Sequence, residues 1–124
     1  MLLYIGIVIA GGIGALMRFL VGRAVTHYGW TALPFGTLAV NVTGSFLMGY
    51  VSWMLVHKWS ASPQTQWLVM TGFLGGFTTF SAFSLETVAM MEQGAELRAL
   101  LYVLSQVLLC VSLCWVGIFL ARHS

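Results

Sequence analysis

The sequence predicts an all-α membrane protein with four transmembrane helices per subunit, in a single domain that covers residues 1–124. Hydrophobic residues make up 60% of the chain and charged residues only 6%, whereas a soluble domain carries about 25% charged residues. The five basic and three acidic residues also divide the chain into four long uncharged stretches. Each stretch is long enough for a span of about 20 apolar residues.

The first predicted span covers residues 2–22. It is uncharged up to Met17, and its apolar character continues past Arg18 as far as Val21. No Lys or Arg precedes Arg18, whereas a secretory signal begins with a basic region and ends in a cleavage site. We therefore expect a permanent span. Arg18 either extends its side chain to the membrane surface or forms a vestibule charge that attracts anions.

The second predicted span covers residues 34–56 and begins at Pro34. Thr37, Asn41 and Ser45 follow at intervals of four residues and so lie on one helical face. An asparagine inside a membrane is unfavourable unless it finds a partner or lines a cavity. The polar face therefore indicates either hydrogen bonding between helices or a polar pathway, and the residues alone leave both open.

The third predicted span, residues 67–91, is the most unusual segment. It contains Gly72, Gly75 and Gly76, followed directly by Phe77 and then Thr78 and Thr79. Glycine disfavours a helix by about 1 kcal/mol relative to alanine, so we predict that this helix is broken near the middle of the membrane. Backbone that leaves helical geometry there needs partners for its polar groups, and freed carbonyl oxygens can bind sodium. A tolerated kink is the alternative.

Aromatic and hydroxyl side chains follow these glycines. Phe80 and Phe83 are three residues apart and share a face, with Ser81 and Ser84 beside them. A phenyl ring has a positive edge, so ring edges can attract an anion; packing in the core or against lipid is the alternative. Glu86 either binds a proton or a cation, or lies near the membrane surface.

The fourth predicted span covers residues 97–121. Tyr102, Gln106 and Cys110 are spaced four residues apart, and this polar face suits water, an anion or hydrogen bonding between helices. Cys110 and Cys114 lie in an apolar run without His or carboxylate neighbours. We expect them to act as small buried hydrophobic residues, and not as a disulfide framework or a metal site.

The charges exclude some functions and leave the orientation undecided. The net charge of +2 is too small for a nucleic-acid-binding surface, and no phosphate loop, nucleophile triad or HExxH motif indicates an enzyme. Four spans place both termini on one side, with Lys58 and Arg122. Arg23 and Arg98 lie on the other side, together with Arg18 if it extends outward.

Orientation follows an excess of Lys and Arg on the cytoplasmic side, and here the two sides are almost balanced. We hypothesise that the chain inserts both ways up and pairs with an inverted copy. Small residues four apart, such as Gly72 with Gly76 and Ser45 with Gly49, offer close helix contacts. These contacts lie either within one subunit or between two.

Three motifs resemble the signatures of the Fluc (CrcB) fluoride channel family. They are GGIGALMR at 11–18, GTLAVNVTG at 36–44 and GGFTTFSAFS at 75–84. The resemblance runs through the spans in order and covers nearly the whole chain. It implies an antiparallel, dual-topology homodimer in the cell (inner or plasma) membrane. It also implies passive export of fluoride from the cytoplasm, which reduces fluoride toxicity.

The resemblance also implies roles for individual residues. A structural sodium ion at the centre of the dimer would be held by backbone carbonyls of Gly75 and Thr78. Ala82 stands where many members have Thr, and Cys110 stands where a hydroxyl is common. The fluoride pathway would be lined by residues of the last three spans: Thr37, Asn41, Thr79, Phe80, Ser81, Phe83, Tyr102 and Gln106. The partners implied are fluoride, an inverted second copy and the lipid bilayer.

Two alternatives come from other classes of membrane protein. A small multidrug-type proton-coupled exporter needs a carboxylate embedded in its first helix, and the first predicted span here has no acidic residue. Glu86 could replace that carboxylate only in a different architecture. A non-transporting subunit of a membrane assembly is the second alternative, and the polar faces and the glycine-rich third span argue against it.

Overall fold

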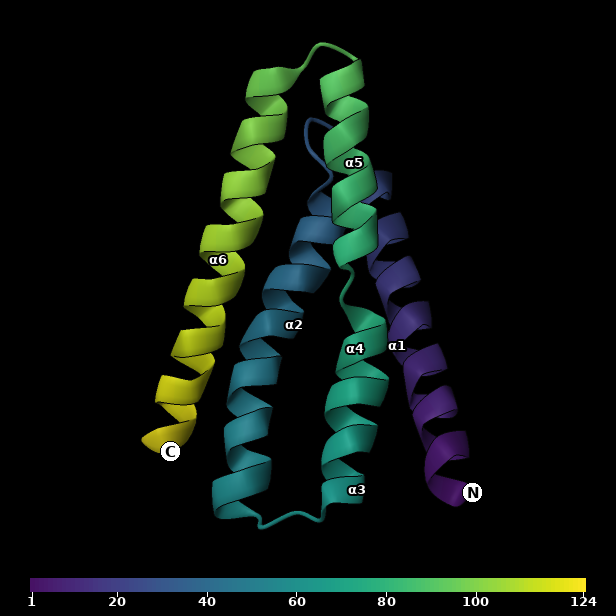
Figure 1. Cartoon of the computed structure of the whole chain (residues 1–124). Coiled ribbons are helices and arrows are strands. Elements are labelled where there is room, and N and C mark those ends of the chain that lie inside the picture. Colours follow the sequence, from purple (N-terminus) through teal and green to yellow (C-terminus); the bar gives the residue numbers. More distant parts are fainter.

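The computed structural model describes residues 1–124 as four long helical segments, each of which runs antiparallel to the one before it in the sequence (Figure 1). The segments are Leu2–His27, Phe35–Lys58, Pro63–Glu92 and Glu96–Arg122, and each is long and apolar enough to cross a membrane. Both termini lie at the same end of the molecule (Figure 1). The prediction of four long apolar helices is therefore confirmed.

Two of the four segments are single helices, and the other two are divided. The first is α1 (Leu2–His27), and the second joins α2 (Phe35–Trp53) to the π-helical turn η1 (Met54–Lys58). The fourth is α6 (Glu96–Arg122). The third segment consists of four parts: α3 (Pro63–Gln66), η2 (Trp67–Leu74), α4 (Gly75–Phe77) and α5 (Phe80–Glu92).

The helices extend beyond the bounds predicted from hydropathy. α1 continues through His27 instead of ending near residue 22. The charge of Arg23 ends the apolar run but not the helix, because the Arg23 side chain is exposed. The chain turns only at Gly29, whose φ is +77°. The third segment begins at Pro63, where the Ser62 hydroxyl accepts a hydrogen bond from a backbone N–H of the first turn. The third helical segment thus starts four residues before the predicted bound at residue 67.

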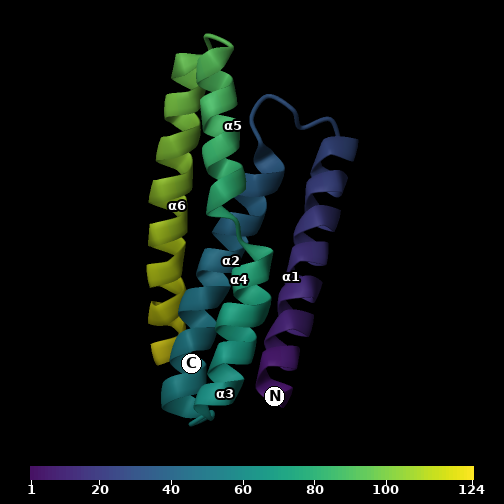
Figure 2. The same cartoon turned by 45° about the vertical axis from the view of Figure 1, so that its right-hand side comes forward.

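Glycines allow the helices to approach each other within the chain. α1 packs against η2 and α4, whereas α2 packs along α6 (Figures 1 and 2). A Cβ atom added to Gly76 would lie 2.3 Å from the carbonyl oxygen of Gly11. One added to Gly49 would lie 2.1 Å from the carbonyl oxygen of Cys114. At these positions the small residues serve packing within one subunit.

The third segment is interrupted between α4 and α5 (Figure 1). Thr78 has φ −83° and ψ 162°, and Thr79 has φ −154° and ψ 115°, so both are extended. The Thr79 hydroxyl accepts a hydrogen bond from the N–H of Ala82 at 3.1 Å and so caps the start of α5. The extended residues lie after the glycines, and the glycines themselves remain helical.

Few side chains are buried within one chain. Only 18 of 124 residues are buried, and large apolar side chains cover the outside of α1 and α6, as expected for surfaces that contact lipid or another subunit. A buried cluster of Phe83, Met90, Ala99 and Tyr102 joins α5 to α6. This contact positions the polar residues of α6 beside the interruption.

Candidate functional site

Asn41 of α2 holds the interrupted backbone in place. Its Nδ2 donates to the carbonyl oxygen of Thr79 at 2.9 Å and to Oε1 of Gln106 at 3.2 Å. Its Oδ1 accepts a hydrogen bond from the N–H of Thr79 at 2.7 Å. Asn41 is only 9% exposed, and these contacts satisfy the amide in its buried position. One asparagine thus connects three helical segments.

The hydrogen bonds continue from Gln106 towards the other end of α5. Nε2 of Gln106 donates to the Tyr102 hydroxyl at 3.1 Å, and that hydroxyl donates to Oε2 of Glu86 at 2.6 Å. The Thr37 hydroxyl donates to Oε1 of Glu86, also at 2.6 Å. Tyr102 is completely buried. Each oxygen of the Glu86 carboxylate therefore accepts a hydrogen bond from one hydroxyl group, and the carboxylate links α2 to α6.

At its other end the network reaches the start of α5. The Thr79 and Ser81 hydroxyl oxygens are 3.4 Å apart, and the Cys110 thiol donates to Oε1 of Gln106 at 3.7 Å. We call the residues that these hydrogen bonds connect through oxygen and nitrogen atoms the polar track. Its members are Thr37, Glu86, Tyr102, Gln106, Asn41, Thr79 and Ser81.

Aromatic rings lie beside the polar track. The Phe80 and Phe83 ring centroids are 5.3 Å apart, with the ring planes at 69°. Phe83 meets Tyr102 in the same edge-on manner, at 5.4 Å and 62°. Phe83 is only 7% exposed, whereas Phe80 is 77% exposed in the single chain. This arrangement combines buried polar donors with ring edges.

A cavity of about 340 Å³ lies between these rings and α6. We call it the aromatic cavity. Its lining includes Asn41, Thr79, Phe80, Phe83, Gln106 and Cys110. The structure therefore brings predicted residues from α2, α5 and α6 to one cavity, although they lie far apart in the sequence.

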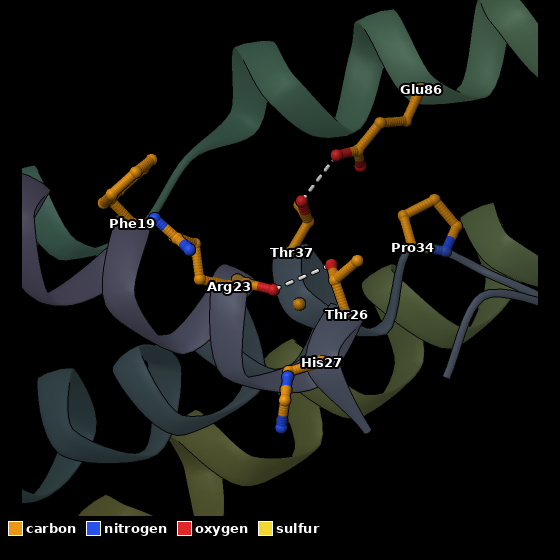
Figure 3. A pocket seen from close by; sticks show the side chains of 9 residues that line it. Phe19, Arg23, Thr26, His27, Pro34, Thr37 and Glu86 are labelled. Atoms are coloured by element: carbon orange, nitrogen blue, oxygen red, sulfur yellow. Dashed lines mark hydrogen bonds between the residues drawn. The ribbon is translucent and has the colours of Figure 1, made fainter. Parts of the chain in front are cut away.

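Figure 2 shows that α1 diverges from α5 towards the C-terminal end of α1. A second pocket, of about 570 Å³, is lined there by residues of α1, α2 and α5 (Figure 3). We call it the outer pocket. Arg23 and His27 of α1 line it together with Thr37 and Glu86, which are hydrogen-bonded to each other (Figure 3). Arg18 is half-buried and is not among the residues that line this pocket. The basic side chain of the outer pocket is that of Arg23, five residues further along the helix.

The backbone carbonyls of Gly75 and Thr78, at the interruption, lack their usual helical donors. In a continuous helix the carbonyl of Gly75 would accept from the N–H of Thr79, but this N–H donates to Asn41. The carbonyl of Thr78 would accept from the N–H of Ala82, which instead donates to the Thr79 hydroxyl. No group of three or more His, Cys, Asp or Glu side chains is arranged to hold a metal. The oxygen atoms at the interruption belong to backbone carbonyls and to the hydroxyl groups of Thr78 and Thr79.

The sequence did not indicate which residues join the polar faces. Glu86 connects Thr37 to Tyr102. The only feature of the sequence that pointed to this role was a carboxylate within an apolar run, in a chain with two hydroxyl-bearing helical faces. The place of Arg23 in the lining of the outer pocket depends on the direction in which α1 diverges from α5. Both depend on how the helices are placed relative to one another.

Comparison with known proteins places the chain among its relatives. Residues 5–118 match the family model described as CrcB-like protein, Camphor Resistance (CrcB). The "Fluoride-specific ion channel FluC" of Rhizobium meliloti is 43% identical over 90% of each chain. The protein of that name from Rhodospirillum centenum is 41% identical over 98% of this chain and 97% of its own.

A further relative of that name, from Methylococcus capsulatus, is 47% identical over 94% of this chain. The match covers 51% of that relative, so the chain spans about half its length. The four apolar helices and these relatives indicate a multi-pass protein of the cell membrane. Because the family model covers nearly the whole chain, the chain belongs to the CrcB family.

Proposed function

We propose that this chain is the subunit of a fluoride-selective channel through which fluoride leaves the cytoplasm by passive diffusion, reducing its toxicity. The observation that carries the proposal is the polar track, whose neutral donors Asn41 and Gln106 line the same cavity as the rings of Phe80 and Phe83. Relatives that share the length of this chain are named fluoride-specific ion channels, and a channel of this kind needs no catalytic residue.

Fluoride is small and strongly hydrated, so a pathway must replace its water shell. Amide and hydroxyl groups of Asn41, Gln106 and Tyr102 now donate to protein acceptors. An entering fluoride ion would compete with those acceptors and would accept hydrogen bonds from these groups one after another. Conduction requires binding that is favourable but weak enough for release, and neutral donors meet this requirement better than a fixed positive charge.

The outer pocket gives the track a wide opening to one side of the membrane. Arg23 and His27 lie on one wall, and the Thr37–Glu86 pair lies on another. A basic side chain at such an opening raises the local anion concentration. In this proposal Arg23 supplies the vestibule charge that the sequence had suggested for Arg18.

We also infer a structural sodium ion held by the carbonyl oxygens of Gly75 and Thr78. Hard cations take oxygen ligands, and interrupted membrane helices supply them from the backbone. The amides that would occupy these two carbonyls donate elsewhere, and Gly75 is exposed on the surface of the single chain. Two chains meeting there would supply four oxygens. A bound cation would fix the interrupted backbone.

The assembly that we propose is an antiparallel, dual-topology homodimer. The near balance of basic residues between the two ends and the exposed Phe80 ring support it. Reporter tags on both termini test the topology, since a dual-topology chain presents each tag on both sides of the membrane. Finding every copy in one orientation would overturn the antiparallel arrangement.

Efflux from liposomes tests the function. Vesicles containing pure protein are loaded with fluoride in one set and with chloride in another. We expect rapid release of fluoride and little release of chloride. No fluoride release from folded, dimeric protein would contradict the proposal. Drug-driven proton flux that Glu86→Gln abolishes would instead favour a proton-coupled exporter, and copurification with a larger complex without flux would favour an assembly subunit.

A further inference from the structure

Three sulfur-containing side chains line the aromatic cavity. Met48 comes from α2, and Cys110 and Cys114 come from α6. Both cysteines are free thiols, and each is half-buried instead of fully buried, which differs from the small buried hydrophobes expected from the sequence. They are four residues apart on one helix, so their Cβ atoms are separated by about 5–6 Å. The proposed pathway gives these sulfur atoms no role.

Thiol and thioether groups are soft ligands that select soft cations such as Cu⁺. Silver ion, Ag⁺, belongs to the same chemical class and favours two sulfur ligands on opposite sides. The two thiols are one helical turn apart, and both line the same cavity as the Met48 thioether. No carboxylate or imidazole lines this cavity to favour a harder metal.

We propose that Cys110, Cys114 and Met48 form a binding site for a soft monovalent cation such as Ag⁺, and that an ion bound there blocks the pathway. When Ag⁺ binds, the S–H bond of one cysteine breaks, its proton passes to water, and a sulfur–silver bond forms. The second thiol and the thioether donate lone pairs, and no electron is transferred. The product carries no net charge, which suits an apolar setting.

The site is coupled to the polar track through one hydrogen bond. The Cys110 thiol donates to Oε1 of Gln106 at 3.7 Å, and the same oxygen accepts from Asn41 at 3.2 Å. A silver-bound Cys110 thiolate can no longer donate, and the ion lies in the cavity that Phe80 and Phe83 also line. The block rests on the proposed function, whereas binding of the cation does not.

Calorimetry and flux separate these two parts. Silver nitrate is titrated into purified wild-type protein in chloride-free buffer, and the same protein in liposomes is assayed for fluoride efflux with and without silver. We expect one tightly bound silver ion per chain and a roughly tenfold or greater loss of flux. Added dithiothreitol, which removes silver, should restore the flux.

The control is the double variant Cys110→Ser with Cys114→Ser, which keeps all seven methionines. We expect it to lose tight silver binding and the block, with each variant compared with its own flux in the absence of silver. Met48→Leu should weaken binding and retain part of the block. Equally tight binding to the double variant would overturn the site, and normal efflux from silver-loaded wild type would overturn the block. If the wild type conducts no fluoride, the proposed function fails, and calorimetry alone decides the site.

Discussion

Replacing Asn41 with alanine removes the one side chain that joins the interrupted backbone to α6. The N–H and the carbonyl oxygen of Thr79 both lose their hydrogen-bond partner. Oε1 of Gln106 loses the hydrogen bond from Asn41 and keeps the one from the Cys110 thiol. Thr79 is only 8% exposed. A buried polar group left unsatisfied costs about 1–3 kcal/mol, so the two backbone groups predict a destabilisation of about 2–6 kcal/mol.

The same substitution removes a donor from the proposed fluoride pathway. A hydrogen bond to a charged group contributes about 1.5–3 kcal/mol. If Asn41 donates to fluoride at the highest point of its passage, losing it slows efflux by roughly ten- to a hundredfold. Fluoride efflux from liposomes, divided by the amount of folded protein, measures this effect separately from the loss of stability.

Val40→Ala is the matched control, because Val40 is the adjacent buried residue on α2 and is 1% exposed. Removing its two methyl groups costs about 2 kcal/mol without breaking a polar contact. We expect Val40→Ala to lose stability and retain flux. Wild-type flux in folded Asn41→Ala protein would remove Asn41 from the pathway. Equal losses of flux in both variants would assign the effect to packing alone.

Three further predictions follow from the rings, the glycines and the carbonyls. Phe80→Ile and Phe83→Ile each retain an apolar side chain but remove the ring edge, so fluoride efflux should fall strongly; unchanged efflux would count against ring edges as anion contacts. Gly76→Ala should lower the melting temperature of the purified protein, because its Cβ would lie 2.3 Å from the carbonyl oxygen of Gly11. Gly12→Ala, with nothing within 4 Å, should raise that temperature slightly through the helix preference of alanine, and equal effects of both changes would contradict the packing. Replacing sodium with a large organic cation should lower the melting temperature of the purified protein, and no change would argue against the proposed structural sodium ion.

The helices could be predicted from the sequence, because hydropathy is a local property. The positions of residues relative to other helices could not. Asn41 and Gln106 each stood out as polar residues in an apolar run, but their 3.2 Å contact depends on the register between α2 and α6. The acceptor role of Glu86 required two hydroxyls to converge from two different helices. Neither relation is a feature of any one segment.

The glycines of the third span illustrate the same limit. Composition marked the segment as weak in helix propensity, yet Gly75 and Gly76 are helical. The extended residues are the threonines that follow, since the partner that stabilises them is Asn41 on another helix. Local propensity thus located the unusual segment, and tertiary hydrogen bonding decided where the helix ends.

The interruption between α4 and α5 has an electrostatic consequence. Each helix end carries about half an elementary charge, negative at the carbonyl end and positive at the amide end. The carbonyl end of the stretch that finishes at Phe77 and the amide end that begins at Phe80 are separated by only Thr78 and Thr79. Two opposite dipole ends therefore meet inside an apolar segment. Because the backbone supplies them, no substitution of a charged side chain can remove this polarity, and it persists at every pH at which the helices are folded.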